Sequence, residues 1–374
     1  MQLKGNNMNT LSKINKSFHE KRPYTPPDKK LTLWQPSDDF MHCCIESRGC
    51  RFSRDYGACI MCDYGMGVNL KPDELKSALE TELQPYMGTL TRLLVGSYGS
   101  IFDTSEVSEE CFEVLLDFIS KQKIRTVIFE THCCTISEDI LHKIQDKLLP
   151  EHNVIIEMGY ESCDPFVLRE CLNKILDLRQ LCTAIELIHS FSMEVSLNVF
   201  LGAPFMNTRA ELDTALESVE WAFGNGADSV VIFPCNIKPF TAIHALYKNG
   251  IYKGISQWLL VELLSRIPEK YLGAVSLSWY GDRKNFYEND EYPLIPPGDC
   301  VQCHEKLFEF YGRFIKEKLS ENRKELIATL VSSVECKCYN RIKDELSQPA
   351  EILTKEEICC LVKEMAKVDR INVK

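Results

Sequence analysis

The chain has 374 residues, of which 45% are hydrophobic and 26% charged, enough for one large domain with additions or for two domains. Its net charge of −11 argues against broad contact with a nucleic-acid backbone, because such affinity comes largely from Lys and Arg. The sequence has neither an apolar run of transmembrane length nor an N-terminal signal segment, so we expect a cytoplasmic protein without membrane contact.

The first 30 residues are polar and rich in Lys and Pro, and they predict a flexible N-terminal arm. Beyond them, short apolar segments alternate with amphipathic ones. Segments that are apolar on both faces are typical of buried parallel strands. The predicted strands span residues 40–47, 90–96, 125–129, 153–158, 194–201 and 229–233.

Between these strands, apolar residues recur at helical spacing, for example over 107–119 and 140–148. Thr208 and Glu211 have the spacing of a capping box, and the helix they begin should end at the glycines of 224–226. Six strand–helix alternations predict a parallel sheet with right-handed crossovers. That number suits an open, partial barrel better than a closed eightfold one.

Three cysteines, Cys50, Cys59 and Cys62, follow the first predicted strand. Three thiolates can hold three corners of a cubane iron–sulfur cluster and leave the fourth iron open to a small molecule. Zinc is equally compatible with this local spacing, and a redox dithiol is a third alternative. Because the loops after the strands carry the chemistry in such folds, the cysteines should lie at the active mouth, where a structural zinc has less reason to be.

A second cysteine group lies near the C-terminus, as Cys300-x2-Cys303 and Cys336-x-Cys338. Two close pairs suit a tetrahedral zinc or an auxiliary iron–sulfur cluster. Free thiols in a tail domain are the alternative. Eighteen cysteines in a chain without a secretion signal favour reduced thiols and metal ligation over disulfides.

Taken in order, the motifs of residues 35–240 resemble the radical S-adenosylmethionine (SAM) superfamily. The run from Arg48 to Tyr64 departs from the usual Cys-x3-Cys-x2-Cys by a longer first gap. In style it is closer to the Elongator-type radical enzymes and the radical subunit of archaeosine synthase. The resemblance implies a [4Fe-4S] cluster on Cys50, Cys59 and Cys62, with SAM bound at its open iron.

Further motifs of the resemblance lie at the strand ends. They are Gly96-Ser97-Tyr98-Gly99 in place of the common Gly-Gly-Glu, Met158-Gly159-Tyr160-Glu161, Asn173-Lys174, Leu201-Gly202-Ala203-Pro204, and Phe233-Pro234-Cys235-Asn236. Because the first of these lacks the usual carboxylate, a hydroxyl or a backbone carbonyl should take its place. The SAM contacts that the resemblance implies are Gly96, Ser97, Tyr98, Gly99, Glu161, Asn198 (toward the ribose) and Pro234.

The fold implied is α/β, a partial (βα)6 TIM-like barrel over residues 31–240. Residues 241–374 would form an α-rich, cysteine-containing extension that completes the site. The implied reaction is reductive cleavage of SAM, which generates a carbon radical that modifies the substrate. An electron donor such as flavodoxin or ferredoxin is then a partner. The residues do not identify a general acid or base, and they leave open whether the enzyme is a transferase or a lyase.

A small-molecule or peptide substrate, as in natural-product biosynthesis, fits the acidic charge and the lack of an appended RNA-binding module. One alternative is a tRNA-base-modifying enzyme like the archaeosine-synthase radical subunit. Another is an enzyme that transfers an aminocarboxypropyl group from SAM. The last is a zinc-binding protein without catalysis.

Overall fold

A computed structural model describes residues 9–24, 27–278, 295–333, 335–369 and 371. In these ranges one curved sheet of eight strands follows the order of the chain from β1 to β8. The first pair is antiparallel and every later pair is parallel. The strands are β1 (Leu31–Ser37), β2 (Phe40–Ile45), β3 (Arg92–Ser97), β4 (Thr126–Thr131), β5 (Asn153–Glu161), β6 (Glu194–Leu201), β7 (Ser229–Pro234) and β8 (Val275–Leu277).

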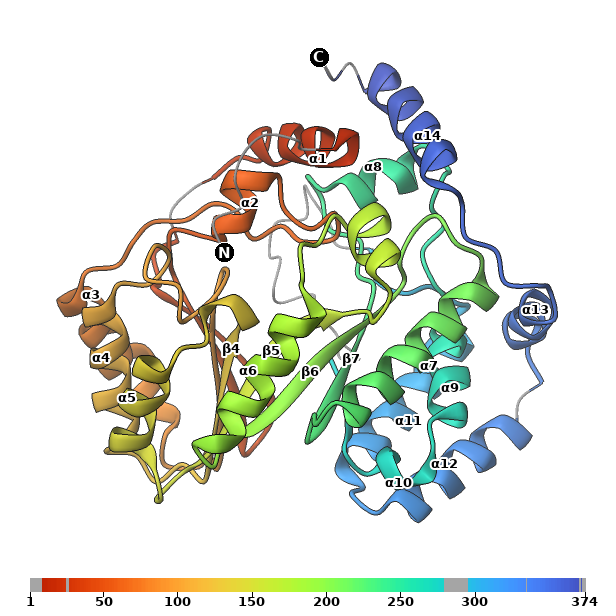
Figure 1. Ribbon diagram of the computed structural model, residues 1–374. Helices are drawn as coiled ribbons and strands as arrows, with labels where there is room; N and C mark the ends of the chain where they lie inside the picture. Colours follow the sequence, from red (N-terminus) through yellow and green to blue (C-terminus); the bar gives the residue numbers. More distant parts are fainter. Residues whose placement is uncertain (1–8, 25–26, 279–294, 334, 370, 372–374) are drawn as a thin grey trace.

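Helices cover the outer side of this sheet, and a helical C-terminal part packs beside its last strands (Figure 1). The helices are α1 (Thr10–Glu20), α2 (Arg51–Tyr56), α3 (Pro72–Ala78), α4 (Glu109–Ile119), α5 (Glu138–Leu148), α6 (Leu178–Ser190), α7 (Thr208–Gly224), α8 (Ala242–Lys248), α9 (Gln257–Arg266), α10 (Glu269–Leu272), α11 (Val301–Lys316), α12 (Ser320–Ser332), α13 (Lys337–Leu346) and α14 (Lys355–Val368). Short helical turns lie at Leu79–Leu83, Gln84–Tyr86, Cys133–Thr135 and Val167–Cys171. No helix within the described ranges is both long and apolar enough to cross a bilayer.

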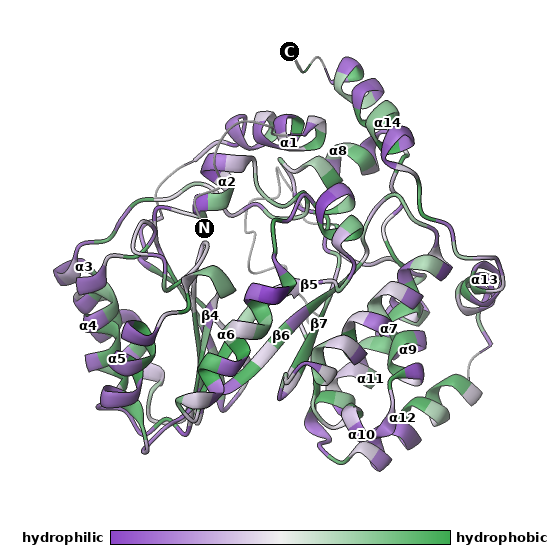
Figure 2. Cartoon of the chain, in the orientation of Figure 1, coloured by the Kyte–Doolittle hydropathy of each residue, from purple (hydrophilic) through white to green (hydrophobic). Residues whose placement is uncertain are grey.

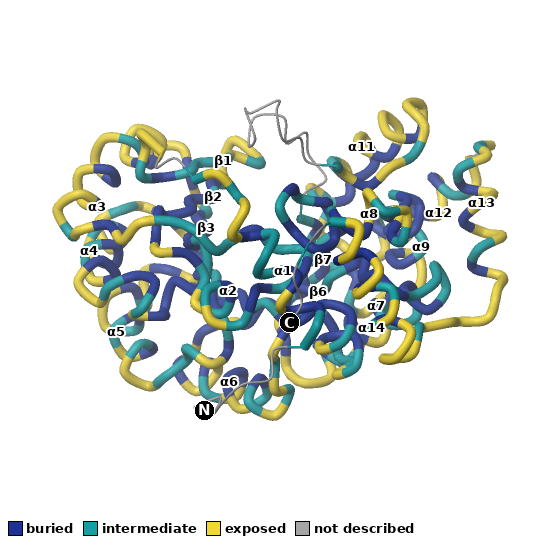
Figure 3. Tube along the Cα trace, turned by 90° about the horizontal axis from the view of Figure 1, so that it is seen from above, coloured by how far each residue is buried: buried dark blue, intermediate teal, exposed yellow. Residues whose placement is uncertain are grey.

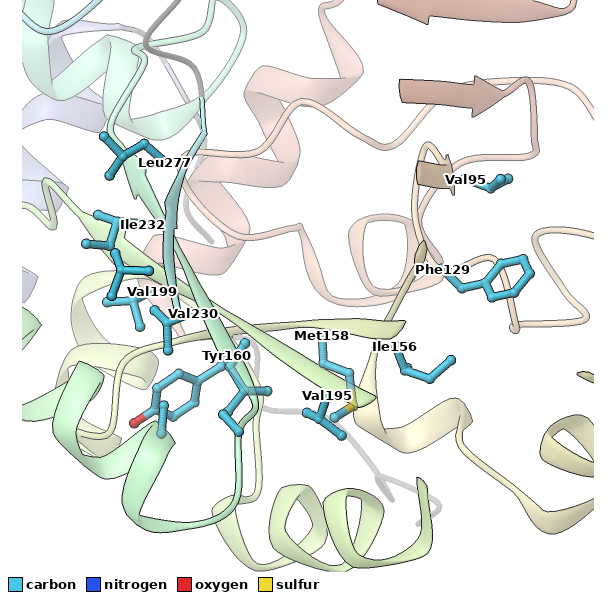
Figure 4. Packing of buried hydrophobic residues seen from close by; sticks show 14 of the residues in the cluster. Val95, Phe129, Ile156, Met158, Tyr160, Val195, Val199, Val230, Ile232 and Leu277 are labelled. Carbon is cyan, nitrogen blue, oxygen red and sulfur yellow. The ribbon is translucent and has the colours of Figure 1, made fainter. Parts of the chain in front are cut away.

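The main hydrophobic core lies outside the curve of the sheet, against the helices. Successive residues of a strand point to opposite faces. Val95, Phe129 and Ile156 are buried in this core (Figure 4), and the outer helices turn their apolar faces toward it (Figure 2). Their strand neighbours Leu94 and Ile128 line a cavity inside the curve. The alternation therefore fills the outside of the half-barrel and leaves its inside open to a ligand.

The predicted α/β half-barrel with an α-rich extension is confirmed. All six predicted strands are present, as β2 to β7. Two strands were not predicted: β1, an antiparallel edge strand, and β8, which has only three residues. Because β8 pairs with β7, the sheet continues beyond residue 240, where the barrel was expected to end.

The prediction of a flexible arm over residues 1–30 is wrong for α1. Asn9 caps this helix by accepting a hydrogen bond from the Ser12 N–H at 2.7 Å. Leu11, Ile14 and Phe18 follow one another at helical spacing and pack into a second hydrophobic cluster. The polar average composition of the segment hid this narrow apolar stripe.

The predicted capping box of α7 is also wrong. Asn207 is the N-cap, and its side chain accepts from the Ala210 N–H at 2.9 Å. Glu211 instead turns back toward the end of β6. Its Oε1 accepts from the Gly202 N–H, and from the Ala203 N–H at 2.8 Å. The carboxyl group is buried and satisfies two backbone donors that would otherwise be unpaired, so it fixes the turn after β6.

Burial raises the pKa of Glu211 from 4.5 to about 8. Because the folded pKa is the higher one, its contribution to stability is complete below about pH 4.5 and is lost as the pH rises toward 8. Glu211→Gln keeps the acceptor oxygen but cannot ionise. We expect the wild type to lose stability relative to this variant by up to about 1.4 kcal/mol per pH unit in that window.

Urea unfolding of both proteins at several pH values between about 5 and 8 measures this difference. Glu113→Gln, at an exposed carboxyl of α4, is the matched control. Parallel pH profiles of the wild type and Glu211→Gln would show that Glu211 does not titrate with folding.

Candidate active site

The structure brings Cys50, Cys59 and Cys62 to one cavity of about 2110 Å³, which runs along the inside of the half-barrel and includes the carboxyl ends of the parallel strands. Cys50 directly precedes α2, and the other two cysteines follow it. The thiols lie near enough to influence one another's pKa. Cys59 raises the pKa of Cys50, Cys62 raises that of Cys59, and Cys50 raises that of Cys62. The view from above in Figure 3 looks toward this end of the sheet.

Three thiols are a ligand set that a cubane cluster with one open iron can take. In the described part of the chain, the group of metal-ligating side chains close enough to share one ion is the C-terminal one, and the three mouth cysteines do not form such a group. Burial raises the pKa of each thiol to about 12, so iron binding, which takes the thiolate, must release protons.

One buried amide holds the cysteine loop. Asn15 of α1 donates from Nδ2 to the carbonyl oxygens of Gly57, Ala58 and Cys59 at 2.6, 3.3 and 3.2 Å. Its Oδ1 accepts from the Ala242 N–H at 2.7 Å and so connects the loop to α8. The side chain is fully buried and uses both of its polar atoms.

Two further contacts complete this support. Asn173 donates to the Ala58 carbonyl at 2.6 Å from the opposite side. Gly57 has a φ of +84°, and a Cβ there would collide with the Ser12 carbonyl, so only glycine suits this position between the loop and α1. The loop is thus fixed from α1, from α8 and from the segment after β5.

An ion pair lies beside Cys59. Lys174 and Glu161 are joined at 2.6 Å between Nζ and Oε1, with both side chains largely buried. Burial opposes the charge of Lys174, but the Glu161 carboxylate holds its pKa above the ordinary value. Glu161, a predicted SAM contact, lines the cavity and has a φ of +68°. Part of its carboxylate is already engaged by lysine.

The glycine-rich turn after β3 is only partly at the cavity. Gly99 lines it, whereas Gly96, Ser97 and Tyr98 are not among its lining residues. A Cβ on Gly99 would lie 2.8 Å from the Cys50 Cα, so this glycine permits the close approach of the turn to the cysteine loop. The roles of all four as SAM contacts stay predictions.

Sequence reasoning missed Glu106, which joins this turn to the cysteine loop. Its carboxyl oxygens accept from the Arg51 N–H and from the Ser100 N–H, both at 2.5 Å. A carboxyl group therefore does lie at the turn that lacks the usual Gly-Gly-Glu, supplied from further along the chain. Burial raises its pKa to about 7. An isolated Glu in a loop carries no signal in the sequence.

The other predicted SAM contacts, Asn198 and Pro234, line the same cavity from β6 and β7. Asn198 is 4% exposed, and its Oδ1 has no hydrogen-bond partner among the described residues. Deeper in the half-barrel, the cavity also meets Glu130 and Glu157, which the sequence did not single out.

The second cysteine group gathers as predicted. Cys300 and Cys336 directly precede α11 and α13. The Sγ atoms of Cys300, Cys303, Cys336 and Cys338 all lie within 4.8 Å of one another. The Cys300–Cys336 and Cys303–Cys336 distances are 3.7 and 3.0 Å. This group can hold a metal ion.

Asn15→Ala should loosen the cysteine loop, because it removes the amide from three loop carbonyls and from the Ala242 N–H. Leaving such buried groups unsatisfied costs on the order of 1–3 kcal/mol. We expect a lower melting temperature and less iron bound after anaerobic reconstitution. Glu20→Ala, at an exposed position of the same helix, is the control. Unchanged iron content and melting temperature in Asn15→Ala would show that the loop does not depend on this amide.

No family model matches the chain. Among curated proteins, it is 20% identical over 276 residues to the uncharacterized protein MJ0550 of Methanocaldococcus jannaschii, covering 69% of this chain and 75% of that protein. It is 23% identical over 226 residues to archaeosine synthase subunit beta of Methanosarcina acetivorans. That match covers 59% of this chain and 64% of the relative, so it spans less than two thirds of the relative's length.

Among solved structures, the chain is similar to the radical S-adenosylmethionine methyltransferase TsrM of Kitasatospora setae, with a TM-score of 0.42 and 10% identity. The match covers 88% of this chain and 61% of that one.

The parallel half-barrel places the three-cysteine loop after its first parallel strand, as the motifs of the sequence predicted. The chain is thus similar to proteins of the radical SAM superfamily.

Proposed function

We propose that this chain is an enzyme that holds a [4Fe-4S] cluster on Cys50, Cys59 and Cys62 and cleaves SAM reductively to modify a small-molecule or peptide substrate by radical chemistry. The observation that carries the proposal is the convergence of three thiols on one large cavity at the mouth of the half-barrel. When bound, the cluster supplies the electron that breaks a carbon–sulfur bond of SAM.

The chain's own residues would bind and orient SAM around this loop. Three thiolates leave one iron without a protein ligand. Lys174 and Glu161 present a fixed pair of opposite charges beside Cys59. Such a pair suits the carboxylate and ammonium groups of the methionine part of SAM. Asp63, after the last cysteine, is paired with Lys238 at 2.7 Å and with Arg22 at 3.6 Å, which hold that end of the loop.

Cys59→Ala tests the proposal, because it removes one of three ligands without touching the other anchors of the loop. We expect the reconstituted wild type to bind about four irons and four sulfides, to be brown, and to form 5′-deoxyadenosine from SAM on reduction. The variant should lose the colour and the product. Cys360→Ala, at an exposed thiol of α14, should retain both. Stoichiometric zinc in place of iron at the mouth, without SAM cleavage, would reject the enzyme.

A second candidate substrate is tRNA, because one curated relative is a subunit of archaeosine synthase. The net charge of −11 argues against it, since phosphate contacts depend on basic side chains. Filter binding of bulk tRNA at physiological salt separates the two. Specific retention would favour tRNA, and its absence would favour the small-molecule or peptide substrate.

For the C-terminal cysteines we propose zinc rather than an auxiliary cluster. Tetrahedral zinc with Zn–S bonds of about 2.3 Å requires sulfur atoms roughly 3.8 Å apart. The four Sγ atoms, all within 4.8 Å, agree with this spacing. Trp258 is fully buried, and its indole N–H interacts with the Cys303 thiol. A thiolate at Cys303 would be a stronger acceptor for this donor.

Cys336→Ser should remove zinc without removing the cluster at the mouth. Metal analysis of the wild type should find about one zinc per chain besides the iron. The variant should lose the zinc, keep the iron, and unfold at a lower temperature, because α11 and α13 lose their shared ligand site. Cys182→Ser, on α6, is the control. Iron at this site, detected as additional iron and sulfide that Cys336→Ser removes, would contradict the choice of zinc.

A further inference from the structure

The cavity continues below the cysteines into the half-barrel, where two carboxyl groups lie at the same level of the sheet. Glu130 on β4 and Glu157 on β5 are directly paired residues, and both line the cavity. Glu157 lies four residues before Glu161, which is roughly 13 Å along an extended strand. The two carboxyl groups are therefore well below the mouth, at the depth where a substrate rather than the methionine part of SAM would lie.

Glu157 is 5% exposed, and in the part of the chain that the structure describes no ion pair includes it. Arg92 also lines the cavity and is near enough to lower the pKa of Glu157, but its guanidinium lies over the Phe40 ring, 4.5 Å from the ring centroid. Burial raises the pKa of Glu157 to about 8, and the neighbouring Glu130 adds to this effect. A buried carboxylate in such a place is costly unless a cation pairs with it.

Asn198 adds a further hydrogen-bond acceptor, its Oδ1 atom, to the lining of the same cavity. Its side chain is hydrogen-bonded to Glu157. Its Oδ1 is buried, has no partner among the described residues, and belongs to a side chain that lines the cavity. Because a buried carbonyl oxygen is normally hydrogen-bonded, this atom indicates a donor that comes from a ligand. Glu157 and Asn198 thus place acceptors on two neighbouring strands, β5 and β6, and Glu130 lies beside Glu157 on β4.

We infer that the interior of the half-barrel binds a substrate group with a positively charged, hydrogen-bond-donating nitrogen, an ammonium or amidinium, held by Glu157 with Glu130 beside it and by Asn198 Oδ1. This rests on the proposed function and names the substrate class of the same site. It assigns Asn198 to the substrate, in place of the ribose contact that the resemblance implies. A neutral hydroxyl could pair with Asn198 but would not compensate the charge of Glu157.

Benzamidine and its uncharged counterpart benzyl alcohol probe the site on the reconstituted holoprotein. Ligand-observed NMR titrations should show that benzamidine binds at least about tenfold more tightly than benzyl alcohol. Glu157→Gln should remove most of this preference, and Glu113→Gln on the outer surface should leave it unchanged. A crystal soaked with benzamidine should place the amidinium between Glu157 and Asn198.

Equal binding of the two probes, or a preference that survives Glu157→Gln, would overturn the inference. Asn198→Leu supplies a second test, since it should weaken benzamidine binding. If that variant weakens SAM binding alone, the ribose assignment holds and the inference fails. SAM cleavage by the wild type is measured in the same preparations. SAM cleavage without a preference for benzamidine contradicts only the inference. A preference for benzamidine without SAM cleavage supports the site and counts against the proposed function.

Discussion

The arrangement at the mouth of the half-barrel depends on one buried carboxamide. Three successive carbonyl groups of the cysteine loop, from Gly57 to Cys59, point at the Nδ2 atom of Asn15. No regular secondary structure satisfies them, because α2 ends at Tyr56 and the backbone turns through positive φ at Gly57 and Ala58. An irregular loop with buried carbonyls needs an external donor. Asn15 supplies it and, through its Oδ1, ties the loop to α8 on the other side.

The sheet is stable although the inside of the half-barrel is a cavity. Its apolar outer residues pack against helices, so the core does not need the inside of the barrel. The inside can then carry groups that would be unfavourable in a core, among them the carboxyl of Glu157 and the amide of Asn198. A wall of acceptors next to an apolar lining is typical of ligand cavities, in which a few polar groups set the orientation.

Much of this could be predicted from the sequence, and the failures have physical reasons. The parallel strands are continuous apolar runs, which is a strong signal, and the cysteines are visible by type and spacing. The helix α1 was missed because its buried face is one narrow stripe within a polar segment. Asn15, Glu106 and Glu211 were missed or misassigned because each acts on backbone groups brought close only by folding. A side chain that serves the backbone of a distant segment leaves no local pattern.

The unusual eight-residue gap between Cys50 and Cys59 has a structural counterpart. The inserted residues form α2, which packs on α1, and the Ser12 hydroxyl donates to the Tyr56 carbonyl at its end. Gap length and N-terminal helix are therefore coupled in this protein. A graft of the common short motif into this scaffold would remove one of the helices that α1 packs on, and trimming the polar N-terminus for expression would remove the support of the cysteine loop. The two segments can be exchanged between homologues only together.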